Sequence, residues 1–158
     1  MYRIKILFTA LLLSILFQTA YSQETVSDSG NTTKSSGTDP RQLVELPDLA
    51  RKLMREDMLD HLSALNEIIV HLAANDLGAA ADVAESRMGM SSMGKHRGTG
   101  MGPGKFMPTE MRDIGWGMHE AATEFSQLAK KGDLKSAYGA LQKVTGSCVA
   151  CHYTYRTR

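Results

Sequence analysis

Two cysteines and one histidine near the end of the chain are the residues with the clearest chemistry. They are Cys148, Cys151 and His152 in the segment CVACHYTYR, and the chain has no other cysteine. On a helix, positions i, i+3 and i+4 share one face. Two thiols and one imidazole would therefore point in the same direction.

This spacing favours covalent attachment of a haem. Two thiols one helical turn apart can add to the two vinyl groups along one porphyrin edge, while the adjacent imidazole reaches the iron. The pattern C-x-x-C-H is a known signature of such attachment. We therefore predict one covalently attached haem c, with its iron, at Cys148, Cys151 and His152.

Three other interpretations of the motif stay open at this stage. A redox-active dithiol would need a strand followed by a helix, with the motif at the helix start. A structural zinc site needs four ligands, so His119 or His96 would have to contribute. A disulfide across one helical turn would be strained.

The segments that precede the motif have helical periodicity. Apolar residues recur at steps of four and three, and the stripe is widened by Leu62 and Ile69. Its members are Met54, Met58, His61, Leu65, Ile68 and Leu72. Further helices are expected over 77–88, 111–129 and 134–155, with Gly132 and Asp133 separating the last two. We predict an all-α fold, an antiparallel four-helix bundle over residues 46–158.

The first 45 residues differ in character from the predicted bundle. Residues 1–22 have a basic start, an apolar run over 6–17 and a small-x-small site, which together predict a signal peptide. A retained N-terminal anchor is the alternative. Residues 23–45, rich in Ser, Thr and Gly, predict a flexible linker. The mature chain is then expected in the periplasm, soluble and without a membrane segment.

Charge argues against a nucleic-acid partner. The whole chain has 18 basic and 17 acidic residues. Loss of Arg3 and Lys5 with the leader leaves 16 basic against 17 acidic residues, a formal charge of −1. A chain without a basic excess lacks the usual electrostatic footprint of nucleic-acid binding.

The motif and its surroundings resemble the cytochrome c′ family of class II c-type cytochromes. CVACHYTYR carries the resemblance most clearly, and RKLMREDMLDHLSALNEII is similar to the family's first helix. The resemblance implies that His152 is the proximal axial ligand and that Cys148 and Cys151 are the thioether anchors. It also implies a position for Arg156 near that histidine, although a solvated terminal arginine is the alternative. Pairing of two chains through their first two helices is a further implication.

The sixth iron ligand would decide between electron transfer and gas binding. A methionine thioether on the first helix gives six-coordinate iron suited to electron transfer, whereas an apolar residue leaves a position open for NO or CO. Counting back from the end of that helix favours Met58, while matching HLSAL to low-spin relatives favours Met54. Core packing is the alternative for each methionine, and it must hold for at least one.

A glycine- and methionine-rich connection over 89–108 has two interpretations. Its methionines and histidine are Met90, Met93, His96, Met101 and Met107. Thioethers suit Cu(I), so the segment could bind copper. Alternatively, these side chains cover the edge of the haem.

The sequence as a whole predicts an exported mono-haem c-type cytochrome. We expect an electron carrier with His/Met-ligated iron, whose redox partner proteins the sequence does not identify. A five-coordinate binder of NO or CO is the alternative, and a Met/His-rich copper-binding protein is a more distant one. No nucleophile–base arrangement is evident, so we do not expect an enzyme.

Overall fold

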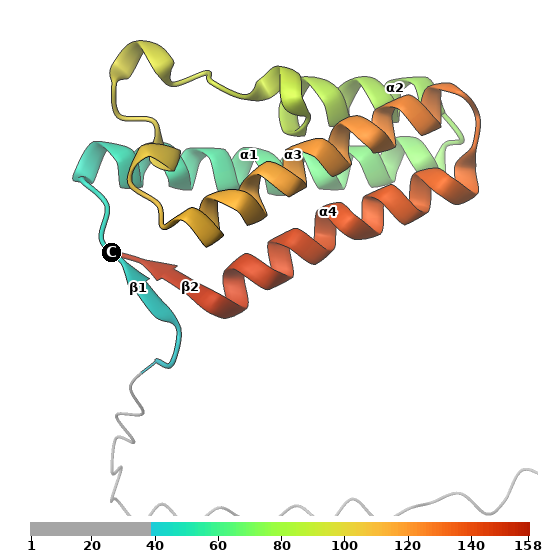
Figure 1. Ribbon diagram of the computed structural model, residues 1–158. Coiled ribbons are helices and arrows are strands. Elements are labelled where there is room, and N and C mark those ends of the chain that lie inside the picture. Colours follow the sequence, from blue (N-terminus) through green and yellow to red (C-terminus); the bar gives the residue numbers. More distant parts are fainter. Residues whose placement is uncertain (1–38) are drawn as a thin grey trace, which may run out of the picture. The chain divides into compact units, whose positions relative to one another are not determined.

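The computed structural model describes residues 39–158, and four helices dominate it (Figure 1). The bounds are α1 Asp48–Ala73, α2 Leu77–Val83, α3 Thr109–Lys130 and α4 Leu134–Thr154. Successive helices run in opposite directions in Figure 1. The prediction of a four-helix bundle is confirmed. The predicted signal peptide and residues 23–38 of the predicted linker lie outside the described residues.

Short polar turns separate the helices, and residues in these turns cap the helix ends. Gly132 takes a left-handed conformation with φ of 75° after α3, as a residue just past a helix end often does. The Asp133 carboxylate then accepts a hydrogen bond of 3.1 Å from the backbone N–H of Ser136, which caps α4. The Asp76 carboxylate does the same for α2, at 3.0 Å from the N–H of Ala79. The predicted boundary between the last two helices is therefore confirmed.

The second helix differs from the prediction at its C-terminal end. We expected one helix over 77–88, but α2 ends at Val83 and a π-helical turn, η1, covers Ala84–Met88. Arg87 in this turn joins it to α1: its guanidinium reaches the carboxylate of Asp60 at 2.6 Å and that of Glu67 at 2.7 Å. Short π-helical segments are rare, and this one is tied to residues that lie 20 and 27 positions earlier in the sequence.

The connection between α2 and α3 is folded into short helical turns. These are η2 Met90–Ser92, η3 Arg97–Thr99 and η4 Pro103–Lys105. Two contacts hold the connection against α1, because the Asp57 carboxylate meets Lys95 Nζ at 2.6 Å and His96 Nε2 at 2.9 Å. The segment therefore lies over the side of the bundle formed by α1 and α3.

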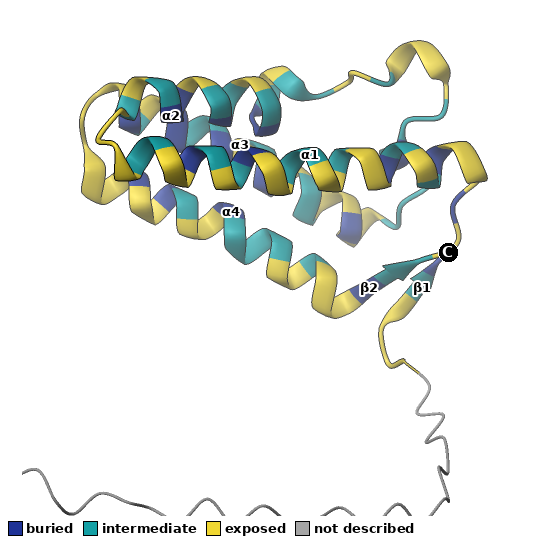
Figure 2. Cartoon of the chain, turned by 180° about the vertical axis from the view of Figure 1, so that it is seen from behind, coloured by how far each residue is buried: buried dark blue, intermediate teal, exposed yellow. Residues whose placement is uncertain are grey.

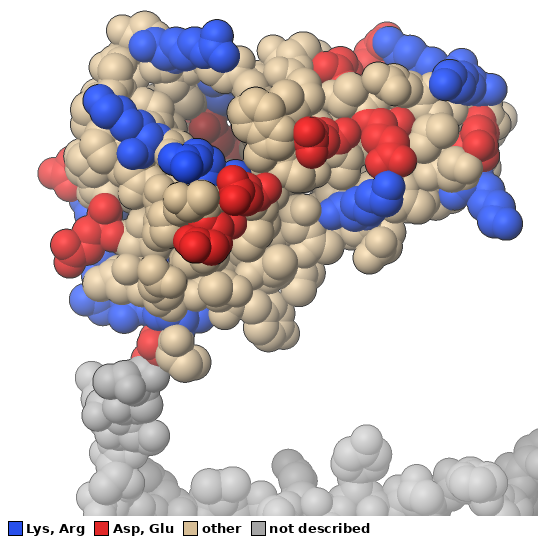
Figure 3. Space-filling view, viewed as in Figure 1, with Lys and Arg blue, Asp and Glu red and all other residues tan. Residues whose placement is uncertain are grey.

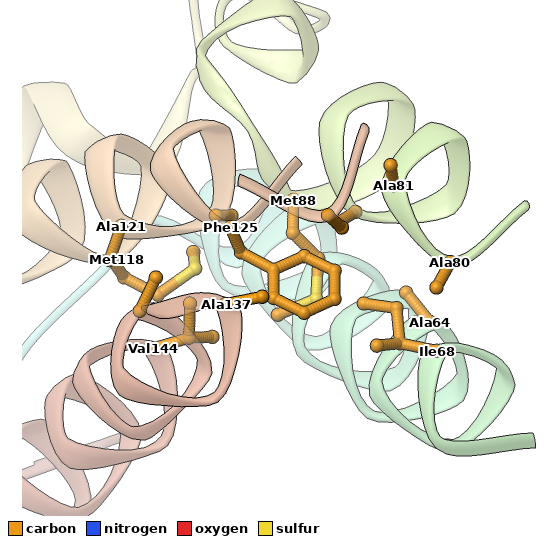
Figure 4. Close-up of a cluster of buried hydrophobic side chains, with 14 residues drawn as sticks. Ala64, Ile68, Ala80, Ala81, Met88, Met118, Ala121, Phe125, Ala137 and Val144 are labelled. Carbon is orange, nitrogen blue, oxygen red and sulfur yellow. The ribbon is translucent and has the colours of Figure 1, made fainter. Parts of the chain in front are cut away.

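The central core is rich in alanine, which lets the helices approach closely. Phe125, Ile68, Met88 and Val144 are the largest fully buried side chains, and they meet between the helices (Figure 4). Their common burial explains the apolar spacing seen in the sequence. The remaining buried members of this cluster are Ala64, Ala80, Ala81, Ala84, Met118, Ala121, Ala122, Ala129, Ala137 and Ala140.

Part of the predicted apolar stripe of α1 is exposed. Leu62 is 66% exposed and Ile69 is 53% exposed, whereas Met54 and Ile68 on the same helix are buried. Figures 1 and 2 agree that α4 diverges from α1 toward its C-terminal end, and Figure 2 shows exposed residues along α1 on this side. The edge of the stripe that includes Leu62 and Ile69 is therefore not covered by protein.

A two-stranded parallel sheet joins the two ends of the described chain. Strand β1, Gln42–Val44, pairs with β2, Tyr155–Thr157, with Val44 opposite Thr157. The sequence analysis detected no strands, and it placed Tyr155 on the last helix and residues 42–44 in the linker. Val44 is only 5% exposed, so the folded part begins before residue 46.

A second, smaller group of buried side chains lies beside this sheet. We call it the terminal cluster, and it includes Met54, Met111 and Tyr155. Its other buried members are Val44, Leu46 and Ala50. Cys151 packs against it. The terminal cluster therefore connects the haem-type motif of α4 with α1 and α3.

Candidate haem-attachment site

The last turns of α4 carry the two thiols. Cys148 and Cys151 lie in continuous helix, both are half-buried, and both are free thiols rather than a disulfide. The thiol of Cys148 donates a weak hydrogen bond to the carbonyl oxygen of Val144, at 3.4 Å. The structure therefore places the two sulfurs one turn apart on a single helix, as the spacing predicted.

Burial keeps both cysteines protonated. It raises the pKa of the Cys148 thiol, and it raises that of Cys151, with the neighbouring Cys148 adding to the effect. Moving a thiol out of water disfavours its charged form. Both sulfurs are thus neutral S–H groups near neutral pH.

The imidazole of His152 is less buried than the two thiols on the same helix. His152 is classed as exposed, and so is Tyr153 beside it. Within residues 39–158 its ring makes no hydrogen bond or ion pair. Its backbone carbonyl accepts a hydrogen bond of 3.4 Å from Arg41 Nη1. The divergence of α4 from α1 leaves this end of the motif uncovered.

Arg156 lies in β2 and contacts the segment before α1. Its Nε donates to the carbonyl oxygen of Arg41 at 3.3 Å and lies 3.7 Å from the Asp39 carboxylate. Hydrogen bonds from Arg41 lower the pKa of Asp39 to about 2, so this carboxylate stays charged. Sequence reasoning missed Asp39 and Arg41 because their contacts with His152 and Arg156 join residues far apart in the sequence.

The two candidate sixth ligands lie in different surroundings on α1. Met54 is 7% exposed and belongs to the terminal cluster, against which Cys151 packs. Met58, one turn later, is 39% exposed. Both line a cavity of about 560 Å³ between α1, the 92–107 segment and α3. Neither Cys148 nor Cys151 lines this cavity. Met54 therefore lies both on the wall of the cavity and in the cluster against which Cys151 packs.

Three histidines also line this cavity, namely His61, His96 and His119. His61 of α1 and His119 of α3 meet edge to face, with ring centroids 5.7 Å apart. Burial lowers the pKa of His61 to about 4, so its imidazole is neutral near neutral pH. The apolar stripe of the first helix included His61, but only the packing of α1 against α3 brings it together with His119.

The donor set fits a covalently bound haem. The structure provides two free thiols, an adjacent imidazole whose ring has no partner among residues 39–158, and two thioethers on a facing helix. The exposed Leu62 on α1 adds apolar surface of the kind that a porphyrin covers. Cys148, Cys151 and His152 would hold the group, and the α1 side would cover it.

Comparison with known proteins supports this assignment. The family model described as Cytochrome C' matches residues 106–156, which comprise α3, α4 and the motif. No curated protein and no solved structure matches the chain. The resemblance to the cytochrome c′ family is confirmed over the matched residues, and it supports a haem-binding protein of the c type.

Proposed function

We propose that this chain is an exported mono-haem c-type cytochrome that carries single electrons. One observation carries the proposal: free thiols at Cys148 and Cys151 lie one turn apart, beside His152, inside the segment that matches the family model. Bound haem would supply an iron centre that changes oxidation state by one electron. The protein's part is to hold and orient that centre.

The two thiols would form the covalent attachment. Each S–H adds across one vinyl group, with the sulfur bonding to one carbon and the hydrogen to the other, so no external oxidant is needed. The thiols of Cys148 and Cys151 are free, as this addition requires. Their position one turn apart on α4 would let both thiols hold the same group.

The imidazole of His152 would bind the iron from the side of α4. It adjoins Cys151 in sequence, and its ring has no competing partner among residues 39–158. Arg41 and Arg156 lie close by: Arg41 donates to the His152 carbonyl oxygen, and Arg156 ties β2 to the segment before α1. These contacts support the end of α4 that presents the imidazole.

A thioether from α1 would complete the coordination. Met54 is supported by its place in the terminal cluster, which Cys151 also contacts, and Met58 by its position one turn along the same face. His/Met ligation raises the reduction potential of haem iron and suits electron transfer. A five-coordinate iron that binds NO or CO is the alternative within the same family.

The test is to express the full chain in a host with a haem-attachment system and to purify it from the periplasm. We expect one haem per chain that stays bound in acidified acetone, and a low-spin spectrum that CO does not change. Variants Cys148→Ser and Cys151→Ser should lose covalent haem, and His152→Gln should lose the normal spectrum. The variant His71→Gln, on α1 away from the motif, is the matched control.

Two outcomes would change the conclusion. Protein that is colourless, or whose pigment is extracted by acidified acetone, would overturn haem attachment. A high-spin spectrum with a ready CO adduct would overturn the electron-carrier role and establish the gas-binding alternative. Recovery of the protein from the cytoplasm alone, with its leader uncleaved, would contradict export.

A further inference from the structure

The cavity between α1, the connecting segment and α3 brings together an unusual set of side chains. The cavity has a volume of about 560 Å³, and five methionines and three histidines line it. These residues come from three separate parts of the chain. Cys148 and Cys151 are not among its lining residues. Met93, Met107, Met118 and the three histidines have no role in the proposed haem function, whereas Met54 and Met58 do.

His119 is already oriented as a metal-binding histidine usually is. Its Nδ1 lies 2.7 Å from the carbonyl oxygen of Met88. A carbonyl oxygen only accepts, so Nδ1 carries the hydrogen and Nε2 carries the free electron pair. Histidines that bind metals typically donate their other ring N–H to such an oxygen. His61 approaches the same ring edge to face, with centroids 5.7 Å apart.

The connecting segment contributes thioethers to the wall of the cavity. Met93 and Met107 both line it. The segment is held in place between them, because Lys95 and His96 both bind the carboxylate of Asp57 on α1, at 2.6 and 2.9 Å. These two thioethers therefore lie on the cavity wall before any metal binds.

The chemistry of the wall selects a soft cation of low charge. Within residues 39–158, no three His, Cys, Asp or Glu side chains meet as a metal site, so a metal here would depend on thioethers. Asp57 is the single carboxylate on the wall, and Lys95 and His96 already occupy it. Lys and Arg side chains gather near the hollow seen in Figure 3. Hard divalent cations would find no free carboxylate among the lining residues, whereas neutral sulfur and imidazole ligands suit monovalent Cu(I).

We propose that this cavity binds one Cu(I) ion through His61, His119, Met93 and Met107. The site goes beyond the proposed haem function and does not depend on it. Met54 and Met58 line the same cavity but remain assigned to the haem iron. Copper and haem would then be bound by different side chains.

The test is a competition titration of the purified exported protein with Cu(I). The titration is performed without oxygen, in ascorbate, against a Cu(I) chelator whose complex absorbs visible light. We expect one Cu(I) per chain. His61→Gln and the double variant Met93→Leu/Met107→Leu should each weaken binding at least about tenfold, since a lost ligand costs at least as much as a lost supporting contact. The Met→Leu changes conserve volume, so the fold is retained if the histidine variant proves unstable.

Matched controls are available on the same elements. Met90 of the connecting segment and His71 of α1 are not among the lining residues. Met90→Leu and His71→Gln should therefore leave Cu(I) affinity unchanged. The proposal is overturned if the wild-type chain yields all its copper to the chelator, if Met90→Leu weakens binding as much as the double variant, or if Zn(II) binds as tightly as Cu(I). The haem spectrum, recorded on the same samples, reports separately on the iron site.

Discussion

Met54 and Met58 illustrate how two residues of one type, one turn apart, can have different surroundings. Met54 is packed among Met111, Tyr155 and the other members of the terminal cluster, while Met58 is partly open to solvent beside the cavity. A thioether that binds iron must keep its sulfur available. A thioether that only fills space can be replaced by a side chain of the same volume.

Single replacements should separate these two roles. We expect Met54→Leu to convert a low-spin spectrum to a high-spin one and to permit CO binding, whereas Met58→Leu should leave the spectrum unchanged. The expectation follows from the contact between Cys151 and the terminal cluster that contains Met54. Absorption spectra of both variants, reduced and with CO, are the measurement. The reverse result would assign Met58, and two unchanged spectra would exclude both.

At the scale of elements, Arg87 is the main polar link between η1 and α1. Its guanidinium contacts Asp60 and Glu67 and also donates to the Asp60 backbone carbonyl oxygen at 3.1 Å. The hydrogen bond from Arg87 lowers the pKa of Asp60, with smaller contributions from Lys95 and His61. The link therefore depends on Asp60 being ionised.

This link should make stability sensitive to acid. Because the pKa of Asp60 is lower in the folded chain than in the unfolded one, its contribution is present above about pH 4 and is lost as the pH falls further. Arg87→Gln should reduce the free energy of unfolding at pH 7 by no more than about 1 kcal/mol, since the pair is partly exposed. It should also flatten the decline of that free energy below pH 4. Urea unfolding from pH 3 to pH 7 is the measurement.

A surface pair provides the control for this prediction. Lys143 and Glu124 lie 2.7 Å apart, with side chains 58% and 45% exposed. Lys143→Gln should change the unfolding free energy very little at any pH in the range. An equal loss in the two variants would show that the Arg87 contacts contribute no more than an ordinary surface ion pair.

At the scale of the whole molecule, the β1–β2 pair closes the chain at the end where the motif lies. It joins the residues before α1 to those that directly follow His152. The pairing is reinforced by the Asp39, Arg41 and Arg156 contacts and by the buried side chain of Val44. The end of α4 lies away from α1. The pairing of β1 with β2 therefore supports the last turn of α4 where α1 does not.

Removal of this strand should lower stability and disturb the haem site. A chain that begins at residue 46 should lose about 2 kcal/mol relative to one that begins at residue 39, mainly from the burial of Val44. Both chains would be exported behind the same leader and compared by thermal unfolding and by haem content. Equal melting temperatures would contradict a structural role for β1. A Gln42→Ala variant, at an exposed position of the same strand, serves as the point-mutation control.

Much of the fold follows from local patterns. The bounds of α1, α3 and α4 lie within a few residues of the predicted helices, because apolar spacing and capping residues such as Asp133 act over only a few positions. The exposed edge of α1 and the early end of α2 could not be predicted in the same way. They depend on where α4 lies and on the contacts of Arg87, and both involve residues distant in sequence.

The sequence by itself determined the spacing of the C-x-x-C-H motif and the four helices. Two cysteines and a histidine at fixed offsets specify a shared face wherever the chain is helical, and helix formation is a local process. Only the tertiary structure decided that β1 pairs with β2, that His61 meets His119, and that Met54 rather than Met58 lies with Cys151. Such contacts join residues far apart along the chain, and they form only where packing of whole helices brings their side chains together.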